Sequence, residues 1–199
     1  MSSFSLYYLI FIIESELEEL WIDMREFTKD KSAMEMIARD AKLCQKLNLS
    51  LPYTEEYTYL MNELFYNQIE KNSVVNNQLT VVLPKNVTIG EGVTVMNGAL
   101  LMTAGGITLE DKVMIAVNVQ LISNNQAPYE RDVLTCKPIR IKYGAWVGAG
   151  ATILPDVTVG KYAIVGANSV VSKDIPDYAV MVGSPAKVIK YLDKEKFEK

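Results

Sequence analysis

The chain has 199 residues, 49% of them apolar, which suits one globular domain with a real core and excludes a disordered tail protein. Its 20 Lys and Arg against 24 Asp and Glu give a net charge of −4 without a basic block, so nucleic acid is not an expected partner. Histidine is absent, which excludes Ser-His-Asp catalysis, Cys-His catalysis and His-ligated zinc within this chain. Cys44 and Cys136 are too far apart in sequence for a C-x-x-C site, so we expect no metal and a reducing, cytoplasmic location.

The first apolar stretch, residues 6–13, runs directly into an acidic segment that begins at Glu14. It is too short to span a bilayer, and no Lys or Arg precedes it as in a secretory signal. We therefore expect a buried or subunit-facing helix turn and no membrane partner. Membrane association is the alternative.

From about Glu14 to Gln68 the apolar residues recur at intervals of three and four, as in Leu17, Leu20 and Met24. This stretch contains no glycine, and the segment 48–52 ends in a proline that disfavours helix before it. The pattern predicts a small helical N-terminal region over residues 1–72, with a break at 48–52.

Beyond Asn72 the chain becomes repetitive, and all 11 glycines lie from Gly90 onward. Every sixth position is Val, Ile or Leu: Leu83, Ile89, Val95, Leu101, Ile107, Val113, Val119, Ile141, Val147, Ile153, Val159, Val165 and Val171. A period of six fits neither a helix nor a long strand. It is typical of a solenoid of short strands, in which three units form one triangular coil with the aliphatic side chains inside. We expect about four such coils over residues 73–185.

The repeat loses its phase between Val119 and Ile141, which indicates an inserted loop over residues 120–140. Polar loops that extend from a rigid scaffold commonly contain the functional residues. The alternative is a plain surface loop.

Four segments in the repeat region, 116–122, 146–151, 171–176 and 182–189, resemble the maltose and galactoside O-acetyltransferase family of hexapeptide-repeat acyltransferases. The resemblance covers about residues 87–192. It implies a mainly β protein: a left-handed parallel β-helix, with the small helical N-terminal region before it and a short C-terminal helix over residues 186–199. It further implies acetyl transfer from acetyl-CoA to a hydroxyl of a sugar or related small molecule, with active sites between the subunits of a homotrimer.

The resemblance also implies roles for individual residues. Expected donor-binding positions are Trp146 near the loop, Ala149, Ala167, Ser172 and Lys173, with the basic Lys187 and Lys190 approaching the CoA phosphates. Expected acceptor-binding positions are Met96, Asn97, Tyr129 and Arg131. Lys187 and Lys190 have an alternative reading as the solvated basic end of a helix.

The sequence of the loop differs from the family pattern at the position where the catalytic histidine is expected. The family run resembles Asn-Asn-His-Asp-x-Tyr-x-Arg, and residues 124–131 read Asn-Asn-Gln-Ala-Pro-Tyr-Glu-Arg, so Gln126 stands beside Asn125 at the catalytic histidine's place. A carboxamide cannot accept the hydroxyl proton at neutral pH, so general-base assistance of about 10²–10⁴-fold should be lost. Two alternatives stay open: a base among Glu130, Asp132 and Cys136, or a catalytically silent member that binds CoA or has a structural role.

The residues expected near the acceptor also differ from the family pattern. Met96 stands where many members have an Asn, and an acidic position downstream is replaced by Thr103 and Ala104. These changes predict a less polar acceptor.

Overall fold

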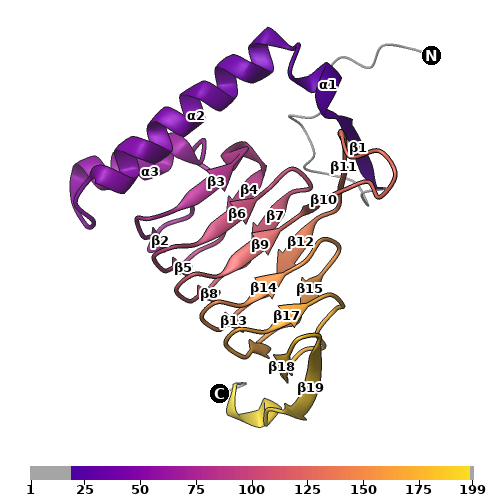
Figure 1. Cartoon of the computed structure of the whole chain (residues 1–199). Helices are drawn as coiled ribbons and strands as arrows, with labels where there is room; N and C mark the ends of the chain where they lie inside the picture. Colours follow the sequence, from indigo (N-terminus) through magenta and orange to yellow (C-terminus); the bar gives the residue numbers. More distant parts are fainter. Residues whose placement is uncertain (1–18, 198–199) are drawn as a thin grey trace.

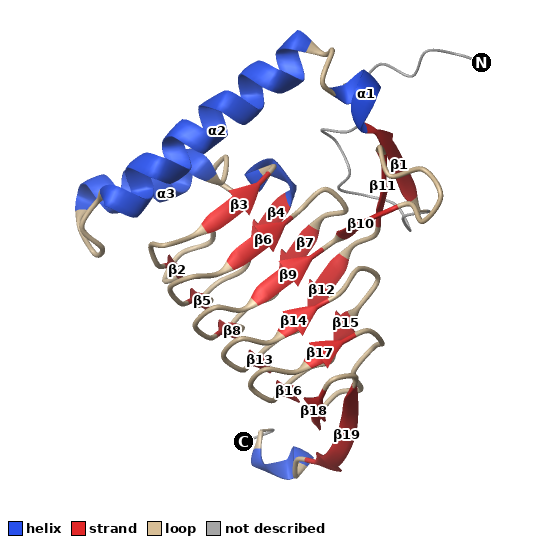
Figure 2. Ribbon diagram, viewed as in Figure 1, coloured by secondary structure: helices blue, strands red, loops and turns tan. Residues whose placement is uncertain are grey.

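The computed structural model describes residues 19–197, which form a three-faced β-helix with helices packed against its N-terminal end (Figures 1 and 2). The helices are α1 (Met24–Phe27), α2 (Lys31–Leu49) and α3 (Glu55–Leu64). The predicted break at 48–52 is confirmed, because α2 ends at Leu49. No helix within residues 19–197 is long and apolar enough to cross a membrane.

The helical pattern expected from about Glu14 is wrong for the first described element. Residues Leu20–Asp23 form a strand, β1, which pairs with a distant strand of the inserted loop. That pairing overrides the local helical spacing, because tertiary contacts outweigh weak propensities. The apolar segment 6–13 lies outside the described residues.

Polar side chains anchor the helical region to the first coil of the prism. The Tyr57 hydroxyl donates to the carbonyl of Val75 at 2.6 Å. The Asn48 carboxamide donates to the carbonyl of Leu79 at 2.8 Å and accepts from the Leu79 N–H at 2.9 Å. Leu47 and Leu64 are fully buried in the same apolar cluster as the prism interior. Helices and prism therefore share one core.

We expect Asn48→Ala to lower the free energy of unfolding by about 1–3 kcal/mol, because the buried Leu79 N–H and C=O both lose a partner. Urea denaturation of the two chains measures the difference. Ser50→Ala is the control, because its exposed hydroxyl bond to the carbonyl of Lys46 should be worth less than about 0.5 kcal/mol. Equal losses in the two variants would contradict the proposed anchoring.

Three sheets of parallel strands make the faces of the prism. The first face holds β2 (Val74–Val75), β5 (Thr94–Val95), β8 (Met114–Ile115), β13 (Trp146–Val147), β16 (Ile164–Val165) and β18 (Ala179–Gly183), with β19 (Ala186–Tyr191) added antiparallel. The second face holds β3 (Thr80–Val82), β6 (Leu100–Met102), β9 (Gln120–Ile122), β14 (Thr152–Ile153) and β17 (Val170–Val171). The third face holds β4 (Val87–Ile89), β7 (Ile107–Leu109), β12 (Ile139–Ile141) and β15 (Thr158–Val159).

The chain turns from the first face to the second at what we name the first corner, and from the second to the third at the second corner. The mainly β, left-handed parallel β-helix predicted from the sequence is confirmed, with about 5 turns rather than the expected four. Between Ile122 and Ile139 the chain leaves the second corner and forms a hairpin of β10 (Asn124–Gln126) and β11 (Val133–Cys136). The excursion from the prism therefore lies within the expected 120–140.

The period-six positions form the core, with two corrections. All except Leu83 are buried. Leu83 is half-buried because it adopts a left-handed backbone conformation, φ 59°, just before a short 3₁₀ turn. Val75, Val95 and Ile115 pair in register, so each of these coils takes 20 residues rather than 18. Ile107, Val113 and Val119 are therefore buried two residues before Leu109, Ile115 and Leu121, which are the residues in register with Ile89, Val95 and Leu101.

The C-terminal helix expected over residues 186–199 is wrong. Residues Ala186–Tyr191 form β19, which pairs antiparallel with β18, and up to residue 197, the last one described, one 3₁₀ turn follows, at Lys194–Lys196. The last coil would otherwise end in an unpaired strand edge, and β19 supplies its hydrogen-bond partners.

Candidate functional site

The inserted loop is clamped at its base. Ser123 is fully buried, and its hydroxyl accepts from the Gly105 N–H at 2.9 Å and donates to the carbonyl of Met102 at 2.8 Å. The Lys137 N–H closes the loop by donating to the carbonyl of Ser123 at 2.9 Å. A methyl group on Gly105 would lie 2.4–2.6 Å from backbone atoms of Ser123 and Lys137, so only glycine fits beneath the two ends.

Above this base, β1, β11 and β10 form a small antiparallel sheet with β11 in the centre. Asn125 is opposite Thr135, whereas Gln126 is opposite Leu134. Because successive side chains of a strand point to opposite faces, Asn125 and Gln126 project to different sides of this sheet. The two residues expected at the catalytic position therefore contact opposite sides of the loop sheet.

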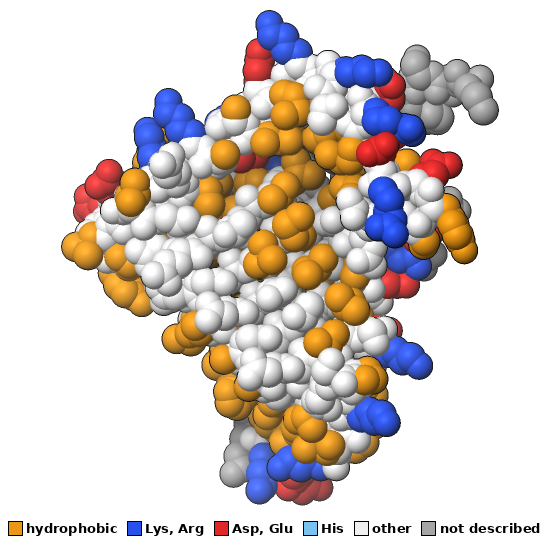
Figure 3. Space-filling model, viewed as in Figure 1, with side chains coloured by type: hydrophobic (Ala, Val, Ile, Leu, Met, Phe, Trp, Pro, Cys, Tyr) orange, Lys and Arg blue, Asp and Glu red, His pale blue; other side chains and the backbone are white. Residues whose placement is uncertain are grey.

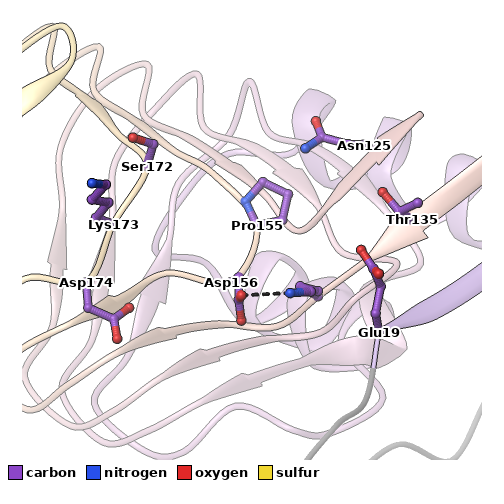
Figure 4. Close-up of a pocket in the computed structure, with 9 residues that line it drawn as sticks. Glu19, Asn125, Thr135, Pro155, Asp156, Ser172, Lys173 and Asp174 are labelled. Carbon is purple, nitrogen blue, oxygen red and sulfur yellow. Dashed lines mark hydrogen bonds and ion pairs between the residues drawn. The ribbon is translucent and has the colours of Figure 1, made fainter. Parts of the chain in front are cut away.

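Asn125 faces a cavity of about 560 Å³ at the second corner (Figure 4). The cavity brings together residues from the loop, the N-terminal segment and the last two coils: Glu19, Asn125, Thr135, Lys137, Pro155, Asp156, Ser172, Lys173 and Asp174. Of the residues expected from sequence, the structure unites Asn125, Ser172 and Lys173 here. Residues distant in sequence thus form one polar site beside the loop.

The cavity holds three carboxylates, of Glu19, Asp156 and Asp174, and two ammonium groups, of Lys137 and Lys173. Lys137 Nζ lies 2.9 Å from Asp156 Oδ2, and this ion pair raises the pKa of Lys137, with Glu19 adding to the effect. Asp174 Oδ1 accepts the Thr158 N–H at 2.7 Å and so braces the corner. Lys173 is in no ion pair among residues 19–197, so its ammonium group is available to an anionic ligand.

Sequence reasoning missed several residues of this cavity. Thr135 lies on the returning strand β11 and Lys137 directly follows it, so the alternation along that strand could have indicated both. Glu19 carried no such signal, because it reaches the cavity only through the pairing of β1 with β11.

The other expected residues lie elsewhere on the prism. Asn97, Ala149 and Ala167 stand in one column at the first corner, where backbone hydrogen bonds join successive coils through Val117. Met96, 41% exposed, precedes Asn97 at this corner. Trp146 was expected near the loop, but within one chain it lies on the first face between Met114 and Ile164. The second corner and the first corner therefore each hold part of the expected site.

The basic residues near the C-terminus are exposed on β19. Lys187 is opposite Val182, close to the turn at the first corner, and Lys190 is opposite Val180, farther along the face. Both belong to a strand, so their alternative reading as the end of a C-terminal helix is wrong.

The tip of the loop is open to solvent. Gln126 is exposed at the end of β10, and Tyr129 is 98% exposed. Arg131 donates from Nε to the carbonyl of Pro128 at 3.3 Å, a contact within the tip. Glu130 and Asp132 are also exposed in this turn. None of these five residues lines the cavity beside Asn125.

Cys136 is 1% exposed, and burial raises the pKa of its thiol to about 11. The thiol therefore keeps its proton at neutral pH and does not serve as a general base. The folded thiol holds its proton more tightly than the unfolded thiol, whose pKa is about 8.5. The stability that this difference contributes is fully present below pH 8.5 and is lost as the pH rises toward 11.

We expect iodoacetamide at pH 8 to modify Cys136 in the native chain at least about 100-fold more slowly than in urea, because two pKa units lower the thiolate fraction by that factor. Peptide mass spectrometry over time gives both rates. Modification of native Cys136 at the denatured rate would show an open thiol and restore it as a candidate base.

Comparison with known proteins adds to this geometry. Residues 138–173 match the family model described as bacterial transferase hexapeptide (six repeats). A Staphylococcus aureus protein named "Putative acetyltransferase" is 30% identical over 191 residues, 92% of each chain.

Solved structures are similar as well. The hexapeptide-repeat acetyltransferase VCA0836 of Vibrio cholerae, in complex with acetyl-CoA, has a TM-score of 0.78 at 26% identity, covering 83% of this chain and 91% of that one. A maltose O-acetyltransferase of Clostridium difficile has a TM-score of 0.77 at 27% identity, covering 84% and 92%. A galactoside acetyltransferase in complex with coenzyme A has a TM-score of 0.79 at 25% identity, covering 88% and 94%.

Proposed function

Because this chain belongs to the hexapeptide-repeat acetyltransferases of the maltose and galactoside O-acetyltransferase family, we propose that it is an acetyl-CoA-dependent O-acetyltransferase acting on a sugar or a related small hydroxyl acceptor. The observation that carries the proposal is the loop clamped at the second corner, which holds Asn125 beside Ser172 and Lys173 in one cavity. Both cysteines are free thiols, which suits the cytoplasmic location that we also propose.

Three lysines can bind the phosphates of an anionic donor. Lys173 offers an unpaired ammonium group at the cavity, and Lys187 and Lys190 are exposed at the end of the prism. Ammonium groups bind phosphates as point charges. Within the cavity Glu19, Asp156 and Asp174 outnumber Lys137 and Lys173, so phosphates would meet repulsion there, and Lys173 would hold them at the rim.

The reaction joins the acceptor oxygen to the acetyl carbon, breaks the bond from that carbon to sulfur, and leaves the hydroxyl proton on the released thiol. Asn125 and Gln126 can orient the reacting groups through their carboxamides, but neither can take the proton. Transfer by the chain as it stands is therefore expected to be slow, by about 10²–10⁴-fold relative to a site with a base. Of the candidate bases in the loop, only the exposed Glu130 and Asp132 remain.

We further propose that the complete site lies between subunits of a homotrimer. The expected residues are divided between two corners of the prism in one chain, so a second chain must bring a first corner to a second corner. The second face and the start of the second corner carry partly exposed apolar side chains, Val82, Leu100, Met102, Ile122 and Leu154. Figure 3 shows hydrophobic side chains gathered across the centre of this view. Light scattering that finds a monomer would contradict the shared site.

A catalytically silent member that binds CoA is the second candidate, and Gln126 is the observation that favours it. The test is acetyl transfer from acetyl-CoA to a panel of sugars and simple alcohols, with thiol release and product mass both recorded, beside calorimetric CoA binding. Turnover with an acetylated product supports the transferase. CoA binding without turnover, in this chain and in a variant with histidine restored at position 126, supports the silent member.

Lys173→Met removes the charge and keeps the length of the side chain, so we expect CoA affinity to fall about 10- to 100-fold, the range for a lost charge-assisted hydrogen bond. Isothermal titration at two salt concentrations measures the loss and its weakening at high salt. The control is Lys161→Met, because Lys161 lies over the Tyr162 ring at 5.3 Å, away from this cavity. Unchanged CoA affinity in Lys173→Met would remove Lys173 from the donor site.

A further inference from the structure

Aromatic rings fasten the end of the chain to the third corner, where the chain passes from the third face to the first. The Tyr162 ring is stacked on Phe197, with centroids 4.4 Å apart. It also lies 5.4 Å from the ring of Tyr143 and 5.7 Å from that of Tyr178, which is 5.9 Å from Phe197. Aromatic pairs within about 7 Å attract each other beyond the area that they bury. We name these four residues the aromatic clasp.

The backbone at this corner leaves room for the clasp. A methyl group added at Gly144 would lie 2.5 Å from Tyr162 Cε1, so the ring occupies space that only a glycine leaves free. Gly92 is at the same corner two coils earlier and has nearly the same φ, +67° against +65°. The nearest atom to a methyl group there would be Lys112 Cγ at 3.8 Å. The two glycines therefore differ in the ring that covers one of them, which makes them a matched pair for experiment.

The strand that carries the C-terminal lysines is weakly held. β19 is the outermost strand of the first face, and within the described part of the chain it pairs with β18 alone. A register shift between Val180 and Met181 interrupts this pairing, so Lys190 and Tyr191 form a short paired segment beyond the irregularity. Edges and irregularities are the weak parts of a sheet. The fastening of this end of β19 therefore depends on the residues that follow it.

Two contacts hold the residues that follow β19. The Leu192 N–H donates to the carbonyl of Tyr178 at 2.7 Å. The chain then makes the 3₁₀ turn at Lys194–Lys196 (Figure 1), and this turn brings Phe197 back onto Tyr162. Tyr178 thus holds the end of β19 through its carbonyl and contacts Phe197 through its ring. The clasp and the end of β19 are therefore mechanically connected.

We propose that the aromatic clasp keeps β19 in place for donor binding, with Phe197 as a positioning residue for Lys187 and Lys190. Both lysines are exposed on β19, and the clasp fixes the end of the strand that carries them. A strand that is already ordered loses less conformational freedom when the phosphates of CoA bind, so the ligand binds more tightly. This inference rests on the proposed function, because it takes these two lysines as ligands of CoA.

Phe197→Ala is expected to lower CoA affinity roughly three- to tenfold, the range for the loss of one aromatic contact. Phe197→Tyr keeps the ring and should keep the affinity. Lys161→Met should keep it as well, because methionine still packs on the Tyr162 ring. The control for a lost aromatic side chain is Tyr59→Ala, because Tyr59 is 63% exposed on α3, at the other end of the prism. Isothermal titration with CoA measures each affinity, and an unchanged value in Phe197→Ala would overturn the proposal.

A double-mutant cycle separates positioning from a general loss of stability. In a chain that carries both Lys187→Met and Lys190→Met, Phe197→Ala should cause no further loss of CoA affinity, because the clasp acts through these lysines. An equal loss in both backgrounds would overturn the proposal. Hydrogen exchange checks the cause: amides of residues 186–192 should exchange roughly three- to tenfold faster in Phe197→Ala, and those of β13 at an unchanged rate. Unchanged exchange in residues 186–192 would also contradict the proposed fastening.

The two glycines test the clasp from its other side. Gly144→Ala should displace the Tyr162 ring and reproduce the loss of CoA affinity, whereas Gly92→Ala should leave the affinity unchanged. An equal loss in both variants would assign the effect to backbone strain and overturn the proposal. An unaltered chain that binds no CoA would contradict the proposed function, and this inference with it. CoA binding without any acetylated product would contradict the proposed transfer alone, whereas full CoA affinity in Phe197→Ala would contradict this inference alone.

Discussion

Replacing Gln126 by histidine is expected to raise kcat for acetyl transfer by about 10²–10⁴-fold, the usual contribution of a general base. Gln126 is exposed at the end of β10, so an imidazole can be accommodated there without entering the core. The neutral ring would accept the hydroxyl proton that a carboxamide cannot. Steady-state kinetics with saturating acetyl-CoA measure the change, and the pH profile should gain a limb near the pKa of a histidine, about 6.5.

The control is Gln126→Asn, which keeps the carboxamide and should give no such increase or new pH limb. If the histidine variant and the unaltered chain turn over equally fast, another group already supplies the base, and Glu130 and Asp132 become the residues to replace next. A lower KM with an unchanged kcat would assign position 126 to acceptor binding rather than to proton transfer.

Gly105→Ala is expected to destabilise the fold by about 1–3 kcal/mol and to lower transfer activity by roughly 100-fold, because the added methyl group displaces both ends of the loop. The methyl would overlap the Ser123 carbonyl and the backbone of Lys137, none of which can rotate away as a flexible side chain would. Urea denaturation and the acetyl-transfer assay measure the two effects.

Gly92→Ala is the matched control, because its methyl would have room, with Lys112 Cγ as the nearest atom at 3.8 Å. Its left-handed backbone, φ +67°, should cost about 1 kcal/mol without changing the transfer rate. If Gly105→Ala retains full activity, the loop does not depend on this clamp for its position.

The resemblance to the family predicted more of the functional residues than composition and spacing alone did. Asn125, Ser172 and Lys173, to which the resemblance gives catalytic and donor-binding roles, line one cavity. The opposite orientations of Asn125 and Gln126 were not anticipated, because they depend on the pairing of β10 with β11 inside a loop whose repeat pattern has stopped. The aromatic clasp was likewise not anticipated, because its rings come from three successive turns at the third corner and from the segment after β19, where the repeat pattern has ended.

The repeat pattern alone predicts the prism, because one inward aliphatic residue per six-residue unit fits no other regular structure and repeats along much of the chain. Strong local signals likewise predict the helix break at 48–52 and the position of the loop. The strand at residues 186–191, the strand β1 and the contribution of Glu19 to the cavity are evident only in the folded chain. Each of these features depends on a sheet edge or a partner strand that is far away in sequence. Pairing with such a partner does not require any periodic pattern in the segment's own residues, so the sequence of the segment does not reveal it.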